Sequence, residues 1–401
     1  MDKHDGSKHD DNQHGLGTRA IHAGFMRDEY GSVMPAIYQT STFAFDSTAQ
    51  GAARFAGTEP GYIYTRLGNP TIEMLQRNVA ALEGGASALA CSSGMAASNT
   101  LFFALLSAGD HVVTSDALYG PTRGVLEQHW SRFGVEGSFV NTADLNTVRA
   151  AMKPNTKLLF IESPANPTLK ISDIAGCARL AHEHGALLVA DNTFMSPILQ
   201  RPIEHGADIV VHSITKFLNG HSDVVGGIII FRDAALAARV RPVWYNLGGT
   251  MDPHQAWLVL RGLKTLKMRV LTAQANAQQL AAMLAAHPAV AEVYYPAHAS
   301  AEQRAIHEKQ ADGPGSLISF ELRGGMDAGS KLMESLSLMT LAVSLGGVET
   351  LIEHPASMTH RGMAPEQRLA AGITDGLVRL SVGCEDIEDL LADMQQGLAQ
   401  L

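Results

Sequence analysis

A lysine follows two hydroxyl residues where an apolar run of the sequence ends. The run ADIVVHS closes on Ser213, and Thr215 and Lys216 follow it. Polar residues often end strands and lysine is a common surface cation, so a purely structural interpretation is available. The functional interpretation is that Lys216 binds a group covalently while the two hydroxyls hold an anion beside it. The rest of the chain has to decide between the two.

Two more motifs follow predicted strands. In CSSGMAAS at 91–98, Gly94 would let the backbone approach an anion, and the N–H groups from Met95 onward would face that anion at a helix start. In VADNTF at 189–194, Asp191 directly follows an apolar run, where a carboxylate is costly to bury without a cation or strong donor. A ligand with a phosphate, an aldehyde and a protonatable ring nitrogen satisfies all three motifs. Pyridoxal phosphate (PLP) is that molecule.

These motifs assign roles in a PLP site. Lys216 would bind the aldehyde, and Asp191 would keep the ring nitrogen protonated so that the ring accepts electrons. The phosphate would be held by Gly94, Met95, Ser213 and Thr215. Tyr119, in DALYGPTRG, would stack on the ring and act as an acid or base. An amphipathic core tyrosine is an equally good interpretation of Tyr119 taken alone.

The elements that must position these motifs form a repeating pattern. Between about residues 85 and 245, short apolar runs alternate with helical segments such as ISDIAGCARLAHEHG. Strands are predicted at 86–91, 111–116, 136–141, 157–163, 186–192, 207–213 and 226–231. The alternation predicts an α/β fold with a mainly parallel sheet covered on both faces, in which ligands gather at the carboxyl ends of the strands.

The two ends of the chain differ from this middle part. A helical stretch at 254–286 precedes strands at 290–296 and 316–325, which predicts a smaller α+β domain. Before residue 60 the chain is irregular and punctuated by Gly and Pro, as an arm would be. The predicted division is an N-terminal arm at 1–63 with its first ~15 residues disordered, a PLP-binding domain at 64–262 and a C-terminal domain at 263–401.

Composition argues against several classes of protein. The 401 residues are 46% hydrophobic and 17% charged, which is globular and sufficient for more than one core. A net charge of −10 argues against a nucleic-acid partner. No run resembles a membrane span, and the first residues lack the apolar segment of a secretory signal. The three cysteines, Cys91, Cys177 and Cys384, lack metal-ligand spacing, so we expect no metal site and a reducing, cytoplasmic location.

Nucleotide-binding motifs fit poorly. GLGTRA at 15–20 matches a glycine-rich dinucleotide pattern, but no predicted strand precedes it. The P-loop pattern GxxxxGK[ST] does not occur. Nicotinamide and P-loop chemistry therefore rank well below PLP.

A set of motifs together resembles the Cys/Met-metabolism PLP enzymes. They are YTRLGNPT at 64–71, SSGMAA, LYG, ESPANP at 162–167, VADNTF, VVHSITKFLNGHSD, VSLGGVETLIEHPASMTH at 343–360 and GLVRLSVGCED at 376–386. The resemblance extends from about residue 16 to the C-terminus. It implies the aspartate-aminotransferase type of fold, PLP as cofactor and a small amino acid as substrate.

The same resemblance implies roles around the cofactor. Lys216 would be the lysine that binds PLP, Asp191 the partner of the ring nitrogen and Tyr119 the stacking catalytic tyrosine. Asn166 would contact the phenolic oxygen of the cofactor. The roles of Lys216, Asp191 and Tyr119 agree with those that the residue types suggested by themselves.

Residues for the substrate and for a neighbouring subunit follow from the family pattern too. Ser344 and Arg379 would bind the substrate carboxylate, for which the planar guanidinium is well suited. Tyr64 and Arg66 resemble the pair that reaches into a neighbouring subunit, where Arg66 meets the phosphate and Tyr64 also faces the substrate. The chain would then form a homo-oligomer, a dimer of dimers, with active sites shared between subunits.

Which of the family's activities this chain has is harder to predict than the family itself. Val343 precedes Ser344, where cystathionine-cleaving γ-lyases typically have Glu, and an apolar side chain suits the thioether of methionine or homocysteine. The block TLAVSLGGVETLIEHPASMTH is also most like methionine γ-lyases. Pro121 stands where those lyases usually have Cys, however, and Tyr245 and Asn246 replace their usual Lys–Asp pair.

The implied reaction is α,γ-elimination of L-methionine to methanethiol, 2-oxobutanoate and ammonia. Cystathionine γ-lyase, cystathionine γ-synthase and acylhomoserine sulfhydrylase activities are the alternatives, because they share the early steps. A PLP-binding regulatory protein without catalysis is a further alternative, since a fold alone does not define a function. The joint presence of Lys216, Asp191, Tyr119 and Arg379 argues against it.

Overall fold

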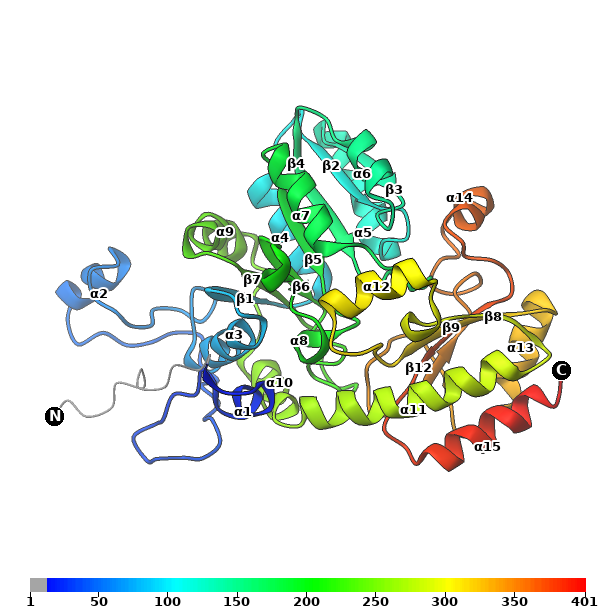
Figure 1. Ribbon diagram of the computed structural model, residues 1–401. Helices are drawn as coiled ribbons and strands as arrows, with labels where there is room; N and C mark the ends of the chain where they lie inside the picture. The colour runs from blue at the N-terminus through cyan, green and yellow to red at the C-terminus, as the bar shows by residue number, and fades with distance from the viewer. Residues whose placement is uncertain (1–12) are drawn as a thin grey trace.

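The structure, a computed structural model, describes residues 13–401. Most of the predicted disordered tail, residues 1–12, lies outside the described residues. Two β-sheets organise the described part, a larger one earlier in the chain and a smaller one towards the C-terminus (Figure 1). The predicted α/β fold with a mainly parallel sheet and a smaller second unit is confirmed.

The larger sheet has seven strands in the order β1-β7-β6-β5-β4-β2-β3. Their bounds are β1 Ser87–Cys91, β2 His111–Ser115, β3 Glu136–Val140, β4 Thr156–Glu162, β5 Leu187–Asp191, β6 Ile209–His212 and β7 Gly227–Phe231. Neighbours from β2 to β6 pair in parallel, whereas β7 runs antiparallel to β1 and β6. The carboxyl ends of β4, β5 and β6 therefore lie side by side at Glu162, Asp191 and His212.

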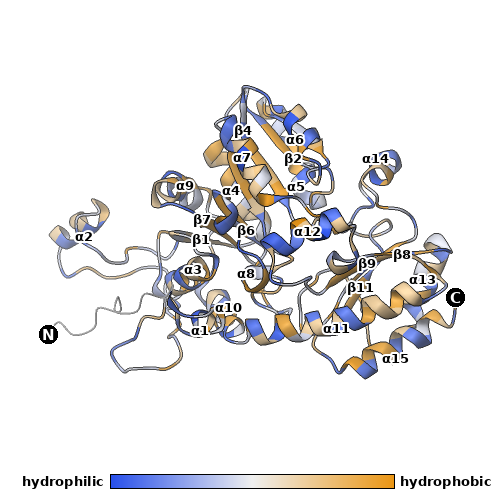
Figure 2. Cartoon of the chain, viewed as in Figure 1, coloured by the Kyte–Doolittle hydropathy of each residue, from blue (hydrophilic) through white to orange (hydrophobic). Residues whose placement is uncertain are grey.

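Helices cover both faces of this sheet, because alternate strand residues point to opposite sides. Leu188 and Val210 pack on one side, with α3 Pro70–Glu83, α7 Ile174–Glu183, α8 Ser196–Leu199 and α10 Pro253–Leu263. Val189 and Ile209 pack on the other, with α4 Gly94–Leu105 and α9 Ala234–Leu247. Shorter helical segments are α5 Gly120–Gly124, η2 Val125–His129, η3 Trp130–Phe133, α6 Leu145–Ala151 and η4 Pro202–His205. Figure 2 shows the strands between these layers mostly in hydrophobic colours.

The smaller sheet has five strands in the order β10-β11-β12-β9-β8. They are β8 Val290–Tyr294, β9 Leu317–Leu322, β10 Thr340–Leu341, β11 Leu351–Glu353 and β12 Leu377–Ser381. The helices in this part of the chain are α11 Leu266–Ala286, η5 Pro296–His298, α12 Ala301–Gln310, α13 Gly325–Ser335, α14 Pro365–Ala370 and α15 Ile387–Leu398. The apolar residues of α11, α13 and α15 form with this sheet a core separate from the two cores of the larger sheet.

The helix predicted at 254–286 is two helices, α10 and α11, so that prediction was wrong at the break between them. The carbonyl oxygen of Gly262 accepts the N–H of Thr265 at 3.2 Å and Arg269 Nη2 at 2.9 Å, which interrupts the regular helical pattern. A Cβ on Gly262 would lie 2.3 Å from the oxygen of Asn219. Because Gly262 has no side chain, α10 can end directly against the segment that follows Lys216.

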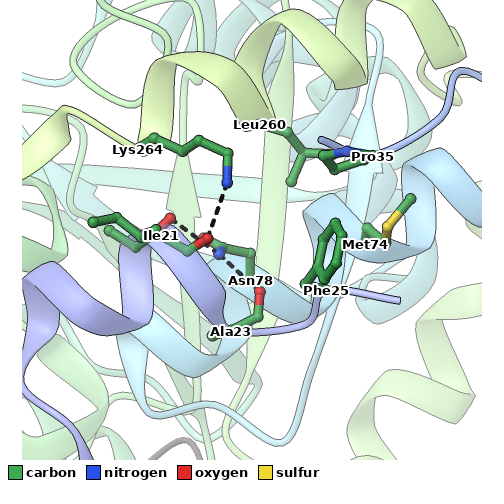
Figure 3. A pocket seen from close by; sticks show the side chains of 9 residues that line it. Ile21, Ala23, Phe25, Pro35, Met74, Asn78, Leu260 and Lys264 are labelled. Atoms are coloured by element: carbon green, nitrogen blue, oxygen red, sulfur yellow. Dashed lines mark hydrogen bonds between the residues drawn. The ribbon is translucent and has the colours of Figure 1, made fainter. Parts of the chain in front are cut away.

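The first residues that the structure describes pack against the rest of the molecule, whereas the segment that follows them extends away from it (Figure 1). Around α1 Leu16–His22, Lys264 Nζ donates to the carbonyl of Ile21 at 3.0 Å and Asn78 Nδ2 to that of Ala23 at 2.9 Å (Figure 3). The segment that carries α2 Thr48–Phe55 extends away from both sheets (Figure 1). The predicted division into an arm at 1–63 and domains at 64–262 and 263–401 stays a prediction.

Two absences hold within residues 13–401. No helix there is both long and apolar enough to cross a membrane. No cluster of three or more His, Cys, Asp or Glu side chains in that range is arranged to hold a metal ion.

Candidate active site

Lys216 lies just beyond the carboxyl end of β6, in a short turn. Its N–H donates to the carbonyl of Ser213 at 3.2 Å, and its carbonyl accepts from Gly220 at 2.8 Å. The side chain reaches the smaller sheet's side of the site, where Nζ donates to Ser344 Oγ at 2.6 Å. Burial, assisted by the positive charge of Arg379, lowers the pKa of Lys216 to about 8. An amine with this pKa is partly uncharged near neutral pH and can act as a nucleophile or base.

The turn at the start of α4 faces the same segment. Ser93 caps the helix by accepting a backbone hydrogen bond at 3.0 Å. A Cβ on Gly94 would lie 3.2 Å from Cβ of Ser213, so any larger residue would have to push Ser213 away by a few tenths of an ångström. Met95 follows in the first helical turn, and a backbone N–H fixes the Thr215 hydroxyl at 3.0 Å. A helix N-terminus beside two hydroxyls is suited to a phosphate.

Asp191 is the last residue of β5, which pairs with β6, the strand that precedes Lys216. Its Oδ1 accepts the N–H of Thr193 at 3.0 Å, and Thr193 Oγ1 accepts the N–H of Ser213 at 2.9 Å. Burial raises the pKa of Asp191, while the contacts with Thr193 oppose that rise. A buried carboxylate in this position gains from a further charged donor, and a protonated ring nitrogen is such a donor.

A buried polar network supports the strand ends from the other face of the sheet. Glu83, the last residue of α3, accepts His212 Nε2 at 2.6 Å and Asn192 Nδ2 at 2.8 Å. Gln200 Nε2 donates to Asn192 Oδ1 at 3.0 Å and to the carbonyl of Ser163 at 2.8 Å. The ends of β4, β5 and β6 are thereby connected through side chains as well as through the sheet.

Arg379 comes from β12 of the smaller sheet and is 3% exposed. Its Nη1 lies 3.0 Å from Asn166 Oδ1, and its Nη2 donates to the carbonyl of Ser344 at 2.8 Å. Ser344 has φ +91°, a left-handed conformation that a non-glycine residue adopts only under constraint. Lys216, Ser344, Arg379 and Asn166 thus form one connected group across the two sheets.

Tyr119 lies at the start of α5 and is 43% exposed. Its backbone N–H donates to Glu162 Oε2 at 3.3 Å. Burial of the phenol raises the pKa of Tyr119, and the charge of Arg379 opposes that rise. Burial together with the nearby Asp191 raises the pKa of Glu162 well above its ordinary value. The exposed ring fits a stacking role better than a core role.

Sequence reasoning missed Glu353, which is 1% exposed and contacts Arg379 Nη1 at 2.9 Å. The signal for it was present, because Glu353 directly follows the apolar pair Leu351 and Ile352, as Asp191 follows its own run. The pairing with Arg379 could not be seen, since it depends on the register between β11 and β12.

Tyr64 and Arg66 lie apart from this group in the described chain. Arg66 Nη1 donates to the carbonyl of Tyr245 at 2.8 Å, and its guanidinium carbon lies 5.7 Å from the centre of the Tyr64 ring. Both residues are exposed, and no hydrogen bond in the described part of the chain joins either to Gly94, Ser213 or Lys216. Val343 is 54% exposed beside Ser344.

The residues that are brought together fit PLP. The close contact of Gly94 with Ser213 forms a cradle that a Cβ would fill, which suits the phosphate. Lys216 supplies an amine of lowered pKa for the aldehyde, and Asp191 a carboxylate for the ring nitrogen. Each functional end of the cofactor therefore has a matching group at one edge of the sheet.

Comparisons with known proteins agree with this fit. The family model of the Cys/Met metabolism PLP-dependent enzymes matches residues 17–399. An L-methionine gamma-lyase of Fusobacterium nucleatum is 49% identical over 392 residues, covering 97% of this chain and 99% of its own. The structure of metB from Corynebacterium glutamicum has a TM-score of 0.93 at 42% identity, covering 98% and 99% of the two chains. Cystathionine gamma-lyase from Lactobacillus plantarum, complexed with L-serine, has a TM-score of 0.91 at 40% identity, covering 96% and 99%.

Proposed function

Because this chain belongs to the Cys/Met-metabolism PLP-dependent enzymes, we propose that it converts L-methionine and water into methanethiol, 2-oxobutanoate and ammonia. The observation that carries the proposal is the 2.6 Å contact between Lys216 Nζ and Ser344 Oγ. It places the reactive amine beside the residues suited to a carboxylate. In an α-amino acid, the carbon that must lose its proton is bonded to that carboxylate.

Different residues of the site would carry out different steps of the elimination. When bound, PLP supplies an aldehyde that takes up the substrate amine and a ring that accepts the electrons released at Cα. Arg379, with Ser344 beside it, would hold the carboxylate, and Asn166 would keep the guanidinium in place. Lys216 Nζ would take the α-proton and then move the β-proton. Tyr119 Oη donates a proton towards the departing γ-sulfur.

Val343 supports methionine as the substrate. Its exposed apolar side chain borders Ser344 and can pack on a thioether, whereas the ammonium group of cystathionine would gain nothing from it. Relatives named as L-methionine gamma-lyases at up to 49% identity support the same choice.

Cystathionine cleavage is the second candidate, favoured by Tyr245 and Asn246. The carbonyl of Tyr245 holds Arg66 at 2.8 Å, so this pair lies beside the segment proposed to reach a neighbouring active site. The structural likeness to a cystathionine gamma-lyase adds to this alternative.

A product assay separates the candidates. We expect methionine to yield methanethiol and 2-oxobutanoate in equal amounts, at a higher kcat/KM than homocysteine, cystathionine, cysteine or O-acetylhomoserine. Lys216→Ala should abolish every turnover in a folded protein that still binds PLP non-covalently. Cleavage of cystathionine with no thiol from methionine would instead select the second candidate.

We also propose that each active site is completed by a second subunit and that the assembly is a dimer of dimers. The separation of Tyr64 and Arg66 from the Lys216 group within one chain supports this. The free thiols of Cys91, Cys177 and Cys384 fit a reducing compartment, so we place the enzyme in the cytoplasm.

A further inference from the structure

The guanidinium of Arg379 is paired with a carboxylate of the protein itself. Nη1 lies 2.9 Å from Glu353 Oε1 and 3.0 Å from Asn166 Oδ1, and Nη2 is bonded to the carbonyl of Ser344. The buried Nε has no hydrogen-bond partner within the described residues. One edge of the guanidinium is therefore committed to the protein, and the Nε–H is still available for a ligand.

Glu353 is arranged to hold this orientation. It stands directly opposite Arg379 in the antiparallel pairing of β11 with β12. Its Oε1 also accepts the hydroxyl of Thr359 at 3.1 Å, while Oε2 is buried and has no hydrogen-bond partner among residues 13–401. A carboxylate with an unsatisfied oxygen thus lies beside the place where a substrate carboxylate has to bind.

We propose that Glu353 is a positioning residue that decides which carboxylates the Arg379 pocket retains. Its hydrogen bond turns the guanidinium so that Nε–H faces the ligand, and its negative charge offsets the positive charge of Arg379. A ligand held only through its carboxylate therefore gains little electrostatic energy. An amino acid is retained because its amine is held as well.

The inference rests on the proposed function for the identity of the product, a 2-oxo acid. That product keeps the carboxylate of the substrate and has lost the amine. Because Glu353 offsets the charge of Arg379, this product is bound weakly and leaves readily. Glu353 would thus reduce inhibition by the product while still admitting the substrate.

Glu353→Gln separates charge from hydrogen bonding, because an amide oxygen still accepts from Arg379 and Thr359. We would titrate the PLP-loaded enzyme with 2-oxobutanoate and its amide analogue 2-oxobutanamide by calorimetry, at mildly alkaline pH so that Glu353 is ionised. Wild-type enzyme should bind the two with similar affinity. The variant should bind the acid roughly tenfold more tightly, the scale on which a neighbouring charge shifts such equilibria, with the amide unchanged.

Glu321→Gln is the matched control, since Glu321 lies on the neighbouring β9 and accepts the hydroxyl of Thr374 without touching Arg379. It should behave as wild type. The proposal is overturned if Glu353→Gln binds the acid no more tightly than Glu321→Gln does. A wild-type preference of tenfold or more for the acid over the amide would overturn it too, without any variant. Neither result depends on whether methionine is the substrate, which the product assay decides separately.

Discussion

Lys216 combines a low pKa with a fixed position, and both have the same origin. The turn after β6 buries the amine against Ser344 and near Arg379, where a positive charge is poorly solvated and repelled. The fold itself therefore gives Lys216 an amine that is partly uncharged near neutral pH and can act as a nucleophile.

The lowered pKa predicts how Lys216 reacts in cofactor-free enzyme. Its amine is uncharged above pH 8, so modification by an amine-directed reagent should rise through about pH 8 and then level off. Exposed lysines should still be accelerating there, because their ordinary pKa is about 10.4. Peptide mass spectrometry after short reaction times gives both profiles. A Lys216 profile that follows that of the surface lysines would contradict the buried, pre-activated amine.

At the level of elements, the turn proposed to bind the phosphate depends on two strands that a short sequence window cannot connect. β7 packs against the turn between β1 and α4, and a Cβ on Gly227 would lie 2.2 Å from the carbonyl oxygen of Ser93. The glycine that opens β7 is therefore what allows the α4 N-terminus to lie against the sheet edge.

Gly227→Ala should displace the α4 N-terminus and weaken phosphate binding. Overpacking of this kind typically costs about 1–3 kcal/mol of folding stability, and the dissociation constant for PLP should rise as well. Gly124→Ala is the control, because a Cβ there meets nothing within 4 Å. Thermal unfolding and equilibrium dialysis of PLP measure the two effects. Equal retention of PLP by both variants would show that the turn does not need this close packing.

Parallel topology explains which site residues could be predicted from the sequence. Lys216 and Asp191 follow strand runs, and in a parallel sheet such positions meet at one edge, so their proximity was predictable. Glu353 was not, because its strand has only three residues and its partner Arg379 is set by sheet register. The break after α10 was missed for a similar reason, since Arg269 makes it through a side-chain contact that periodicity does not report.

At the scale of the whole molecule, the arm has little of its own to pack against. Tyr30, Val33 and Phe55 are 85%, 91% and 70% exposed. The exposed Tyr64 and Arg66 lie where the arm joins α3. Apolar side chains exposed to this degree on an extended segment favour a second copy of the chain as the partner.

Mixing two inactive variants tests the shared site. Lys216→Ala lacks the amine and Arg66→Ala lacks the proposed phosphate contact, so each homo-oligomer should be nearly inactive. In a mixed dimer, one site collects both defects and the other is intact. Co-refolding should therefore restore up to about half of the wild-type activity per mixed dimer, because isologous symmetry gives two equivalent sites. Differently tagged chains that co-purify, bind PLP and stay inactive would place Arg66 in its own subunit's site.

Because the two sheets have separate cores, the two parts of the proposed active site can change independently during evolution. In the proposed site, the amine chemistry would depend on the larger sheet, and recognition of the acid would depend on β11 and β12 of the smaller one. Substitutions around Val343 can therefore change the pocket without altering the strand ends that precede Lys216 and carry Asp191. A lineage built on this frame can exchange one substrate for another through a few changes in a single sheet, and keep the inherited chemistry intact.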